Sequence, residues 1–171
     1  AFFVIVGTAS AQSGAVNGEW RAYAGDGGHT QYTALDQIDR TNVNDLKVAW
    51  IWESESSIPD LQATPLMIAG VLYTTVGGGQ VAAIDARTGQ TIWRFVPQPR
   101  PGAQPPTGAG RGVAYWTDGT IERLFHNLSD GRLVALDLET GTPATEFGDG
   151  GYVDLSLELD RENAGVRSIA A

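Results

Sequence analysis

The stretch VLYTTVGGGQVAAIDARTGQTIWRF at residues 71–95 and the stretch RLFHNLSDGRLVALDLETGTPATEF at residues 123–147 decide the fold. The two align without a gap at a constant offset of 52 residues. The matches are Leu72-Tyr73 with Leu124-Phe125, Gly79 with Gly131, Ala83 with Ala135, Asp85 with Asp137, Thr88-Gly89 with Thr140-Gly141, and Phe95 with Phe147. A register that is kept over this length indicates an internal repeat.

Each unit of the repeat reads as a series of short strands. Residues 71–76 are β-branched and aromatic, residues 77–79 are a glycine turn, and residues 81–85 form the next strand. An Asp-x-x-Thr-Gly turn then leads to a strand at residues 91–95. Successive strands joined by short turns form an antiparallel meander, and a period near 50 residues is typical of one propeller blade.

The length of the chain limits the number of blades. A closed propeller has at least about 4 blades, and 4 units of this period need more than the 171 residues present. Residues 12–171 therefore hold two to three blades, and we expect an all-β, incomplete propeller domain that is the N-terminal part of a longer one. The alternative is a complete small β domain.

The first residues predict export. Residues 2–6 form a short apolar run, and Ala9-Ser10-Ala11 has the small-x-small pattern of a signal-peptide cleavage site. The basic segment that normally precedes such a run is missing, so residues 1–11 are interpreted as a truncated signal peptide. The run either is cleaved or anchors the protein to a membrane.

Composition and charge exclude several functions. The net charge is −9, which argues against a protein that tracks nucleic-acid phosphates and against a polybasic membrane binder. The chain has no cysteine and only two histidines, His29 and His126. Cysteine-ligated metals, thiol nucleophiles and a multi-histidine metal site are therefore ruled out within this chain.

No catalytic centre can be assembled from the spacing of the remaining polar residues. Asp85 and Asp137 occupy equivalent places before a Thr-Gly turn, where an aspartate accepts backbone hydrogen bonds, so we interpret them as structural. The glycines at residues 77–79 lack the Lys-Ser/Thr of a phosphate loop. His29 is expected on the surface in a turn, and His126 in a strand, either satisfied or facing solvent.

Two residues stand out by their position before the first strand of a unit. Gln62 precedes Ala63-Thr64-Pro65-Leu66, and Arg111 precedes Gly112-Val113-Ala114. The first strand of a propeller blade lines the central channel, so both side chains could face a ligand on the axis. An arginine there can hold a carboxylate through two parallel hydrogen bonds. The alternative for Arg111 is an ion pair between blades.

Several motifs resemble the pyrroloquinoline quinone (PQQ)-dependent dehydrogenases. They are GEWRAYAGD from Gly18, YTALDQI from Tyr32, QATPL from Gln62, AIDARTG from Ala83 with Trp93, RGVAYW from Arg111, and GRLVALD from Gly131 with Thr140-Gly141. The resemblance runs from about residue 18 to the end and is strongest to the quinoprotein glucose dehydrogenase branch. The repeat marks only the propeller superfamily, whereas the ordered set with RGVAYW is more specific.

The resemblance implies an eight-bladed propeller with PQQ over the channel and a Ca²⁺ ion beside it. Arg111 matches the family's arginine that contacts PQQ, and Gln62 falls where many relatives carry a cofactor-touching glutamate. The alcohol-oxidising relatives have a vicinal cysteine pair before this arginine, and its absence favours the glucose type. The family's catalytic aspartate and its Ca²⁺ ligands would lie downstream, so no residue of this chain receives a catalytic or metal-binding role.

The resemblance also implies an activity and a location. The expected protein is an exported, periplasmic oxidoreductase, free or attached to the inner membrane, that oxidises a glucose-like aldose or an alcohol. Its electrons would pass to a quinone or cytochrome acceptor, and the fragment alone is expected to be inactive. The alternative is a non-catalytic propeller that serves as a scaffold for protein partners and needs neither Gln62 nor Arg111.

Overall fold

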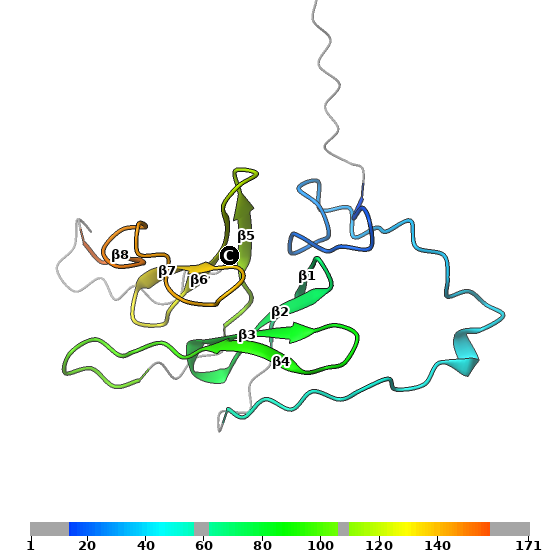
Figure 1. Cartoon of the computed structure of the whole chain (residues 1–171), viewed down its shortest axis with the longest axis horizontal. Helices are drawn as coiled ribbons and strands as arrows, with labels where there is room; N and C mark the ends of the chain where they lie inside the picture. Colours follow the sequence, from blue (N-terminus) through cyan, green and yellow to red (C-terminus); the bar gives the residue numbers. More distant parts are fainter. Residues whose placement is uncertain (1–13, 57–61, 106–109, 158–171) are drawn as a thin grey trace, which may run out of the picture.

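The computed structural model describes residues 14–56, 62–105 and 110–157, which form two four-stranded antiparallel sheets (Figure 1). This confirms the all-β fold and its meander topology. The proposed signal peptide at residues 1–11 lies outside the described residues. Among the residues that are described, no helix has the length and apolarity needed to cross a membrane.

The first sheet has the order β1 (Leu66–Ile68), β2 (Val71–Val76), β3 (Gln80–Asp85) and β4 (Thr91–Phe95). Ala69 and Gly70 join β1 to β2 with φ angles of 48° and 79°, and positive φ at both residues is typical of the tight hairpin turns that match strand twist. The glycine turn η2 (Gly77–Gly79) joins β2 to β3. The three strands and the turn expected from the sequence are thus confirmed.

The second sheet repeats this order with β5 (Ala114–Thr117), β6 (Glu122–Asn127), β7 (Arg132–Asp137) and β8 (Tyr152–Asp154). Strands β3 and β7 keep the offset of 52 residues. In the first hairpin, Leu66 pairs with Tyr73 and Ala114 pairs with Phe125, so the first strands are offset by 48. The second hairpin is longer because its turn has four residues in place of two and because its two strands form one more residue pair.

The last strand of the second sheet differs from the one that the repeat predicts. In the first sheet, Val81 pairs with Phe95. The residue of the second sheet that corresponds to Val81 is Leu133, and it pairs with Val153 and not with Phe147. Pro143 has no N–H to donate to a strand ladder, and the chain turns away after it. Phe147 instead packs edge-on against the ring of Phe125 with 5.2 Å between centroids, so its match to Phe95 holds in sequence only.

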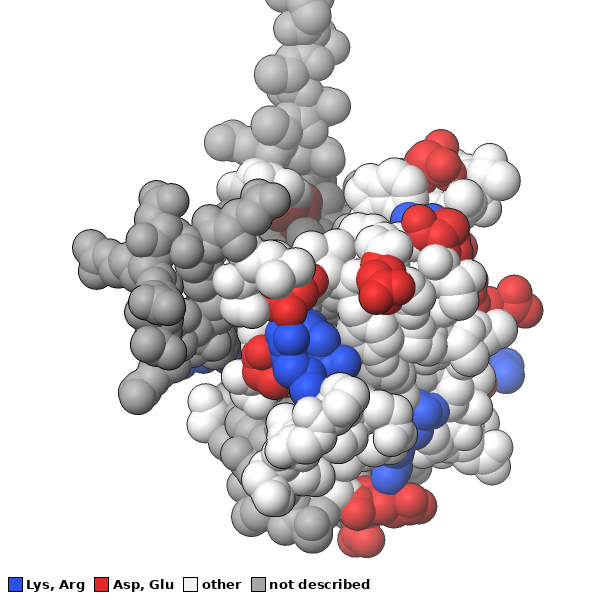
Figure 2. Space-filling model, turned by 90° about the vertical axis from the view of Figure 1, so that its left-hand side faces the viewer, with Lys and Arg blue, Asp and Glu red and all other residues white. Residues whose placement is uncertain are grey.

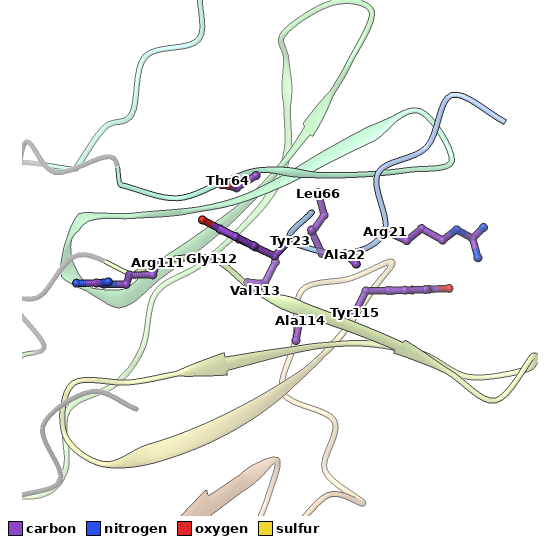
Figure 3. A pocket seen from close by; sticks show the side chains of 10 residues that line it. All are labelled: Arg21, Ala22, Tyr23, Thr64, Leu66, Arg111, Gly112, Val113, Ala114 and Tyr115. Atoms are coloured by element: carbon purple, nitrogen blue, oxygen red, sulfur yellow. The ribbon is translucent and has the colours of Figure 1, made fainter. Parts of the chain in front are cut away.

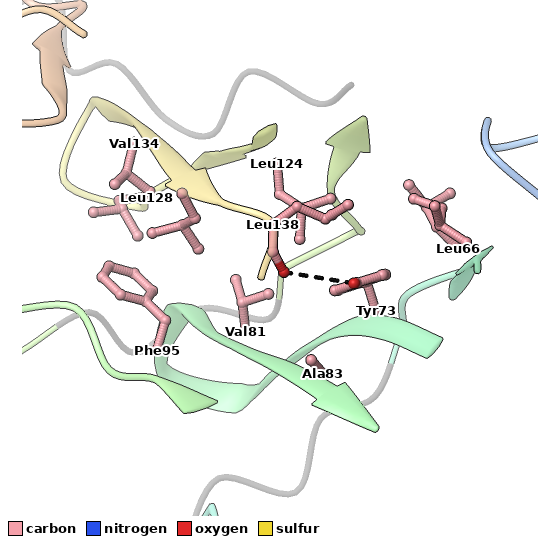
Figure 4. Packing of buried hydrophobic residues seen from close by; sticks show 11 residues of the cluster. Leu66, Tyr73, Val81, Ala83, Phe95, Leu124, Leu128, Val134 and Leu138 are labelled. Carbon is pink, nitrogen blue, oxygen red and sulfur yellow. Dashed lines mark hydrogen bonds between the residues drawn. The ribbon is translucent and has the colours of Figure 1, made fainter. Parts of the chain in front are cut away.

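The hydrophobic core lies between the two sheets (Figure 4). Its buried members come from both sheets and are Leu66, Ile68, Tyr73, Val81, Ala83, Phe95, Leu124, Leu128, Val134, Leu136 and Leu138. Full burial of one such leucine or valine stabilises the fold by about 1.5–3 kcal/mol. Trp93 of β4 is partly buried against this cluster and bonds the carbonyl of Leu138, so it packs between the two sheets.

The segment before the first sheet has little regular structure. It bridges the first sheet where Trp20 pairs with Met67, contains the single turn η1 (Val43–Asp45), and then runs along the outside of the first sheet (Figure 1). Val48 and Ile51 in this stretch are 76% and 78% exposed. The described fold therefore leaves these two apolar side chains exposed on an irregular segment that belongs to neither sheet.

Ion pairs hold the proline-rich loop after β4 against the second sheet. Figure 2 shows basic side chains touching acidic ones on the face that carries β7 and β8. Arg100 in the loop pairs with Asp154 of β8, while Arg132 of β7 pairs with Asp130 and donates to the carbonyl of Gln98 in the loop at 2.6 Å. The hydrogen bond from Arg100 holds the pKa of Asp154 below its usual range.

Candidate functional site

The repeated aspartates are turn residues, as predicted. One carboxylate oxygen of Asp85 accepts hydrogen bonds of 2.9 Å from the amides of Arg87 and Thr88. Asp137 accepts bonds from the amide and hydroxyl of Thr140 at 2.8 and 2.7 Å. These backbone bonds lower the pKa of Asp85. Within residues 14–56, 62–105 and 110–157, no group of three His, Asp or Glu side chains could hold a metal ion.

The two sheets and the N-terminal segment meet at a small hollow (Figure 3). It has a volume of about 180 Å³ and is lined by residues 21–23, by Thr64 and Leu66 at the start of β1, and by residues 111–115 at the start of β5. Enclosed sites for small molecules are usually larger, about 300–1,000 Å³. The hollow is therefore a notch between the first strands of the two sheets and not a complete binding site.

Arg111 stands at one end of this notch. Its side chain is directed outward, away from the guanidinium of Arg21 at the opposite end (Figure 3). Arg111 is exposed and takes part in none of the ion pairs formed among the described residues. The described structure thus offers no ion pair between blades for this residue, and none of its five N–H donors bonds another described residue, so they can receive a carboxylate.

The backbone on both sides of Arg111 is held by buried side chains. The hydroxyl of Thr75 donates to the carbonyl of Gly110 at 2.7 Å, and Nδ1 of His126 lies 3.3 Å from the carbonyl of Gly112. A Cβ on Gly110 would lie 2.7 Å from the Cβ of Thr75, so only glycine allows this approach. The loop that carries Arg111 is therefore anchored to β2 of the first sheet and to β6 of the second.

The two histidines differ in their surroundings. His29 is exposed, as expected, and has a φ of 54° in a turn. His126 is 2% exposed, so it does not face solvent, and its buried Nε2 has no hydrogen-bond partner among the described residues. Burial lowers the pKa of His126, while the carbonyls of Gly112 and Gly79 act in the opposite direction. The ring is therefore neutral near pH 7.

Gln62 occupies the place expected from the sequence but is not part of the notch. Gln62 is exposed and precedes β1. With the offset of 48 between the first strands, Gln62 corresponds to Gly110, which is the residue before Arg111. The residues around the notch include Arg111 and not Gln62. Both residues thus lie ahead of the first strand of their sheets, and their contact with a cofactor stays a prediction.

Two residues at the notch and two behind it were not found by sequence reasoning. The guanidinium of Arg21 lies 5.5 Å from the ring centroid of Tyr115, at the far end of the notch. Thr75 and His126 lie behind Arg111. Arg21 and Tyr115 fall within two of the motifs quoted above, but no spacing or motif predicts these contacts, because each one joins segments whose approach depends on how the two sheets pack.

The geometry defines a piece of a β-propeller, with two stacked four-stranded meanders and, beside their first strands, an arginine that has no acidic partner among the described residues. Residues 20–170 match the family model described as "PQQ: Glucose/ethanol/alcohol dehydrogenase, beta-propeller domain". The chain belongs to this family of PQQ-dependent dehydrogenases, which confirms the resemblance found in the sequence.

Individual relatives support the same assignment. The dehydrogenase subunit of the quinone alcohol dehydrogenase of Komagataeibacter europaeus is 37% identical over 72% of this chain and 16% of that protein. The glycerol dehydrogenase large subunit of Gluconobacter thailandicus is 32% identical over 90% of this chain and 23% of that protein. The quinoprotein glucose dehydrogenase A of Acinetobacter calcoaceticus is 32% identical over 86% of this chain and 22% of that protein.

A solved structure has the same fold. The quinohemoprotein alcohol dehydrogenase of Comamonas testosteroni superposes with a TM-score of 0.67 and 30% identity, over 84% of this chain and 20% of that one. The two sheets therefore correspond to the N-terminal part of a PQQ-type propeller. The chain spans about a fifth of the length of these relatives.

Proposed function

We propose that the chain is the N-terminal part of an exported quinoprotein dehydrogenase that oxidises a hydroxyl group of a sugar or alcohol. The observation that carries this proposal is the guanidinium of Arg111, which is exposed beside the first strands of both sheets and is free of any described acidic partner. Family membership supplies the ligand class, because PQQ is a polycarboxylate.

The residues present fit part of a PQQ site. Arg111 would bind a carboxylate of PQQ through two parallel hydrogen bonds, and Gln62, which is also exposed, would donate or accept a hydrogen bond without adding charge. When bound, PQQ supplies a quinone that takes up the two electrons and two protons lost when a hydroxyl-bearing carbon becomes a carbonyl. A Ca²⁺ ion beside it would act as a Lewis acid, held by ligands outside this chain.

The substrate is proposed to be a polyhydroxylated compound such as an aldose. The chain has no cysteine, and the glycerol and glucose dehydrogenases match 90% and 86% of it. A simple alcohol is the second candidate, because the quinone alcohol dehydrogenases reach 37% identity, although over 72% of the chain. We further propose periplasmic residence, free or attached to the inner membrane, and a quinone or cytochrome as electron acceptor.

The test uses the full-length protein that contains this chain. The cofactor-free protein is titrated with PQQ, followed by tryptophan fluorescence, and then assayed with glucose, glycerol and ethanol, with Ca²⁺ and an artificial electron acceptor. We expect saturable PQQ binding and the highest kcat/KM with glucose or glycerol. Failure to bind PQQ would overturn the proposal and favour the non-catalytic scaffold. PQQ binding with a clear preference for ethanol would overturn only the choice of substrate.

A further inference from the structure

We propose that Thr75 and His126 are positioning residues for Arg111, which hold the carbonyls on either side of it so that its guanidinium meets a carboxylate of the cofactor in one orientation. This inference rests on the proposed function, because it assigns a role to Arg111 in cofactor binding. It adds two buried residues that touch neither the cofactor nor the substrate.

The first contact comes from the first sheet. Thr75 lies in β2 and is fully buried, and its hydroxyl donates to the carbonyl of Gly110 at 2.7 Å. The preceding residue, Thr74, is also buried, but its hydroxyl donates to the carbonyl of Thr75 at 3.3 Å and does not reach the loop. The two neighbouring threonines are both buried, on opposite faces of the sheet, but only Thr75 contacts the segment that carries Arg111.

The second contact comes from the second sheet. His126 lies in β6, and its Nδ1 is 3.3 Å from the carbonyl of Gly112. Since a carbonyl can only accept, Nδ1 must carry the proton in this bond. The Cε1 of the same ring lies 2.9 Å from the place where Gly110 would carry a Cβ. Threonine and histidine therefore close on the Gly-Arg-Gly segment from opposite sheets.

The identity of the flanking residues explains why the segment needs these anchors. Glycine has the widest choice of backbone conformations and loses the most conformational entropy when it is fixed. Gly112 has a φ of 139°, a region that other residues rarely adopt. Without the two hydrogen bonds, the backbone at Arg111 could turn freely. Two parallel hydrogen bonds to a carboxylate depend on a fixed direction of approach.

Burial of these polar groups has no packing advantage. A valine would fill the space of Thr75, and a leucine would fill most of the space of His126, without a polar group to desolvate. Among the described residues, Nε2 of His126 has no hydrogen-bond partner, and its burial is destabilising. Thr75 directs its hydroxyl, and His126 its Nδ1, to the loop next to Arg111, which is the use that accounts for them.

The test is a double-mutant cycle in the full-length protein, measured as the PQQ dissociation constant of the cofactor-free form. We expect Thr75→Val to weaken PQQ binding by roughly tenfold, the upper range for one hydrogen bond, and Thr74→Val to leave it unchanged. Thr75→Ser keeps the hydroxyl and should restore most of the affinity. In an Arg111→Ala background, Thr75→Val should have less than about a twofold effect, because its role is exerted through Arg111.

The same double-mutant cycle with His126 tests the second contact, to the carbonyl of Gly112, independently. We expect His126→Gln, which keeps an N–H donor, to bind PQQ more tightly than His126→Leu. The melting temperature of each cofactor-free variant is measured alongside. Equal losses with and without Arg111, or a lower melting temperature with unchanged PQQ affinity, would show that Thr75 and His126 are only structural. If Thr75→Val and His126→Leu both fail to fold, the proposal is likewise overturned, because stability is then their main role. A wild-type protein that does not bind PQQ would overturn the proposed function itself.

Discussion

The indole Nε1 of Trp93 donates a hydrogen bond of 3.2 Å to the carbonyl of Leu138, and so connects the last strand of the first sheet to a turn of the second. The indole lies so close to Gly141 that a Cβ on that glycine would be 2.3 Å from Cε3 of Trp93. The turn at residues 137–141, which follows β7, therefore packs against an aromatic side chain of the neighbouring sheet.

The same relationship occurs a second time. Trp50 donates through Nε1 to the carbonyl of Ala86 at 3.1 Å, and a Cβ on Gly89 would lie 2.7 Å from Cδ2 of its ring. Ala86 and Gly89 are the counterparts of Leu138 and Gly141 in the repeat. The segment around Trp50 therefore contacts the aspartate turn of the first sheet in the way that Trp93 of β4 contacts the equivalent turn of the second sheet.

This contact predicts the effect of Gly141→Ala in the full-length protein. Alanine at a φ of 69° is strained and its Cβ must displace Trp93, so we expect a loss of about 2–4 kcal/mol in the free energy of unfolding. The control is Gly119→Ala, at a φ of 94° with nothing within 4 Å of its Cβ, which should lose only about 1–2 kcal/mol. Urea unfolding measures both, and equal losses would contradict the packing role of Trp93.

The sequence predicts the first sheet better than the second. The bounds of β2 and β4 follow from runs of β-branched and aromatic residues between glycine-containing turns. The sequence does not predict β8, the last strand of the second sheet. The repeat continues in sequence through Phe147, whereas the chain makes an additional turn after Pro143. A match between side chains does not reveal an insertion when the apolar pattern continues through the turn.

The candidate site was only partly accessible from the sequence. Arg111 was found by its place before a first strand and by the resemblance of its motif. Thr75 and His126 were not, because their role depends on the packing of one sheet against the other. The sequence showed Thr75 only as one residue of a β-branched strand. Side chains that act through contacts between sheets are identified only once the structure has placed those sheets.

The neutral, buried ring of His126 predicts a pH dependence of stability. Its folded pKa lies below its unfolded value of about 6.5 because burial disfavours the charged form. As the pH falls below about 6.5, the unfolded chain binds a proton that the folded chain does not, so stability is lost by up to about 1.4 kcal/mol per pH unit until the folded pKa is reached.

The measurement is urea unfolding of the full-length protein at several pH values between about 7.5 and 5, with His126→Leu as the comparison. We expect the variant to be less dependent on pH over this interval, whatever its absolute stability. Parallel curves for the wild type and the variant would show that His126 is accessible to protons in the folded protein.

The exposed stretch before the first sheet predicts self-association of this chain when it is produced alone. Val48 and Ile51 are more than three-quarters exposed, on a segment that belongs to neither described sheet, and exposed apolar side chains of this kind favour aggregation. We expect the 171-residue chain to elute as oligomers in size-exclusion chromatography. The double variant Val48→Ser/Ile51→Ser should shift it toward the monomer, while Val16→Ser should not. A monomeric wild-type chain with a cooperative melting transition would contradict this prediction.

Arg111 gives the most direct prediction for cofactor binding. Lysine keeps the positive charge but lacks the planar pair of donors that matches a carboxylate. We therefore expect Arg111→Lys to weaken PQQ binding to the full-length protein, and Arg111→Ala to weaken it more, by about 2–5 kcal/mol if a carboxylate is left buried and unpaired. The control is Arg87→Ala, which removes an exposed arginine from the turn after β3.

Because Arg111 has no described partner, the melting temperature of the cofactor-free protein should change little. Unchanged PQQ affinity in Arg111→Ala, together with a large loss of stability without cofactor, would show that Arg111 supports the propeller and does not bind PQQ.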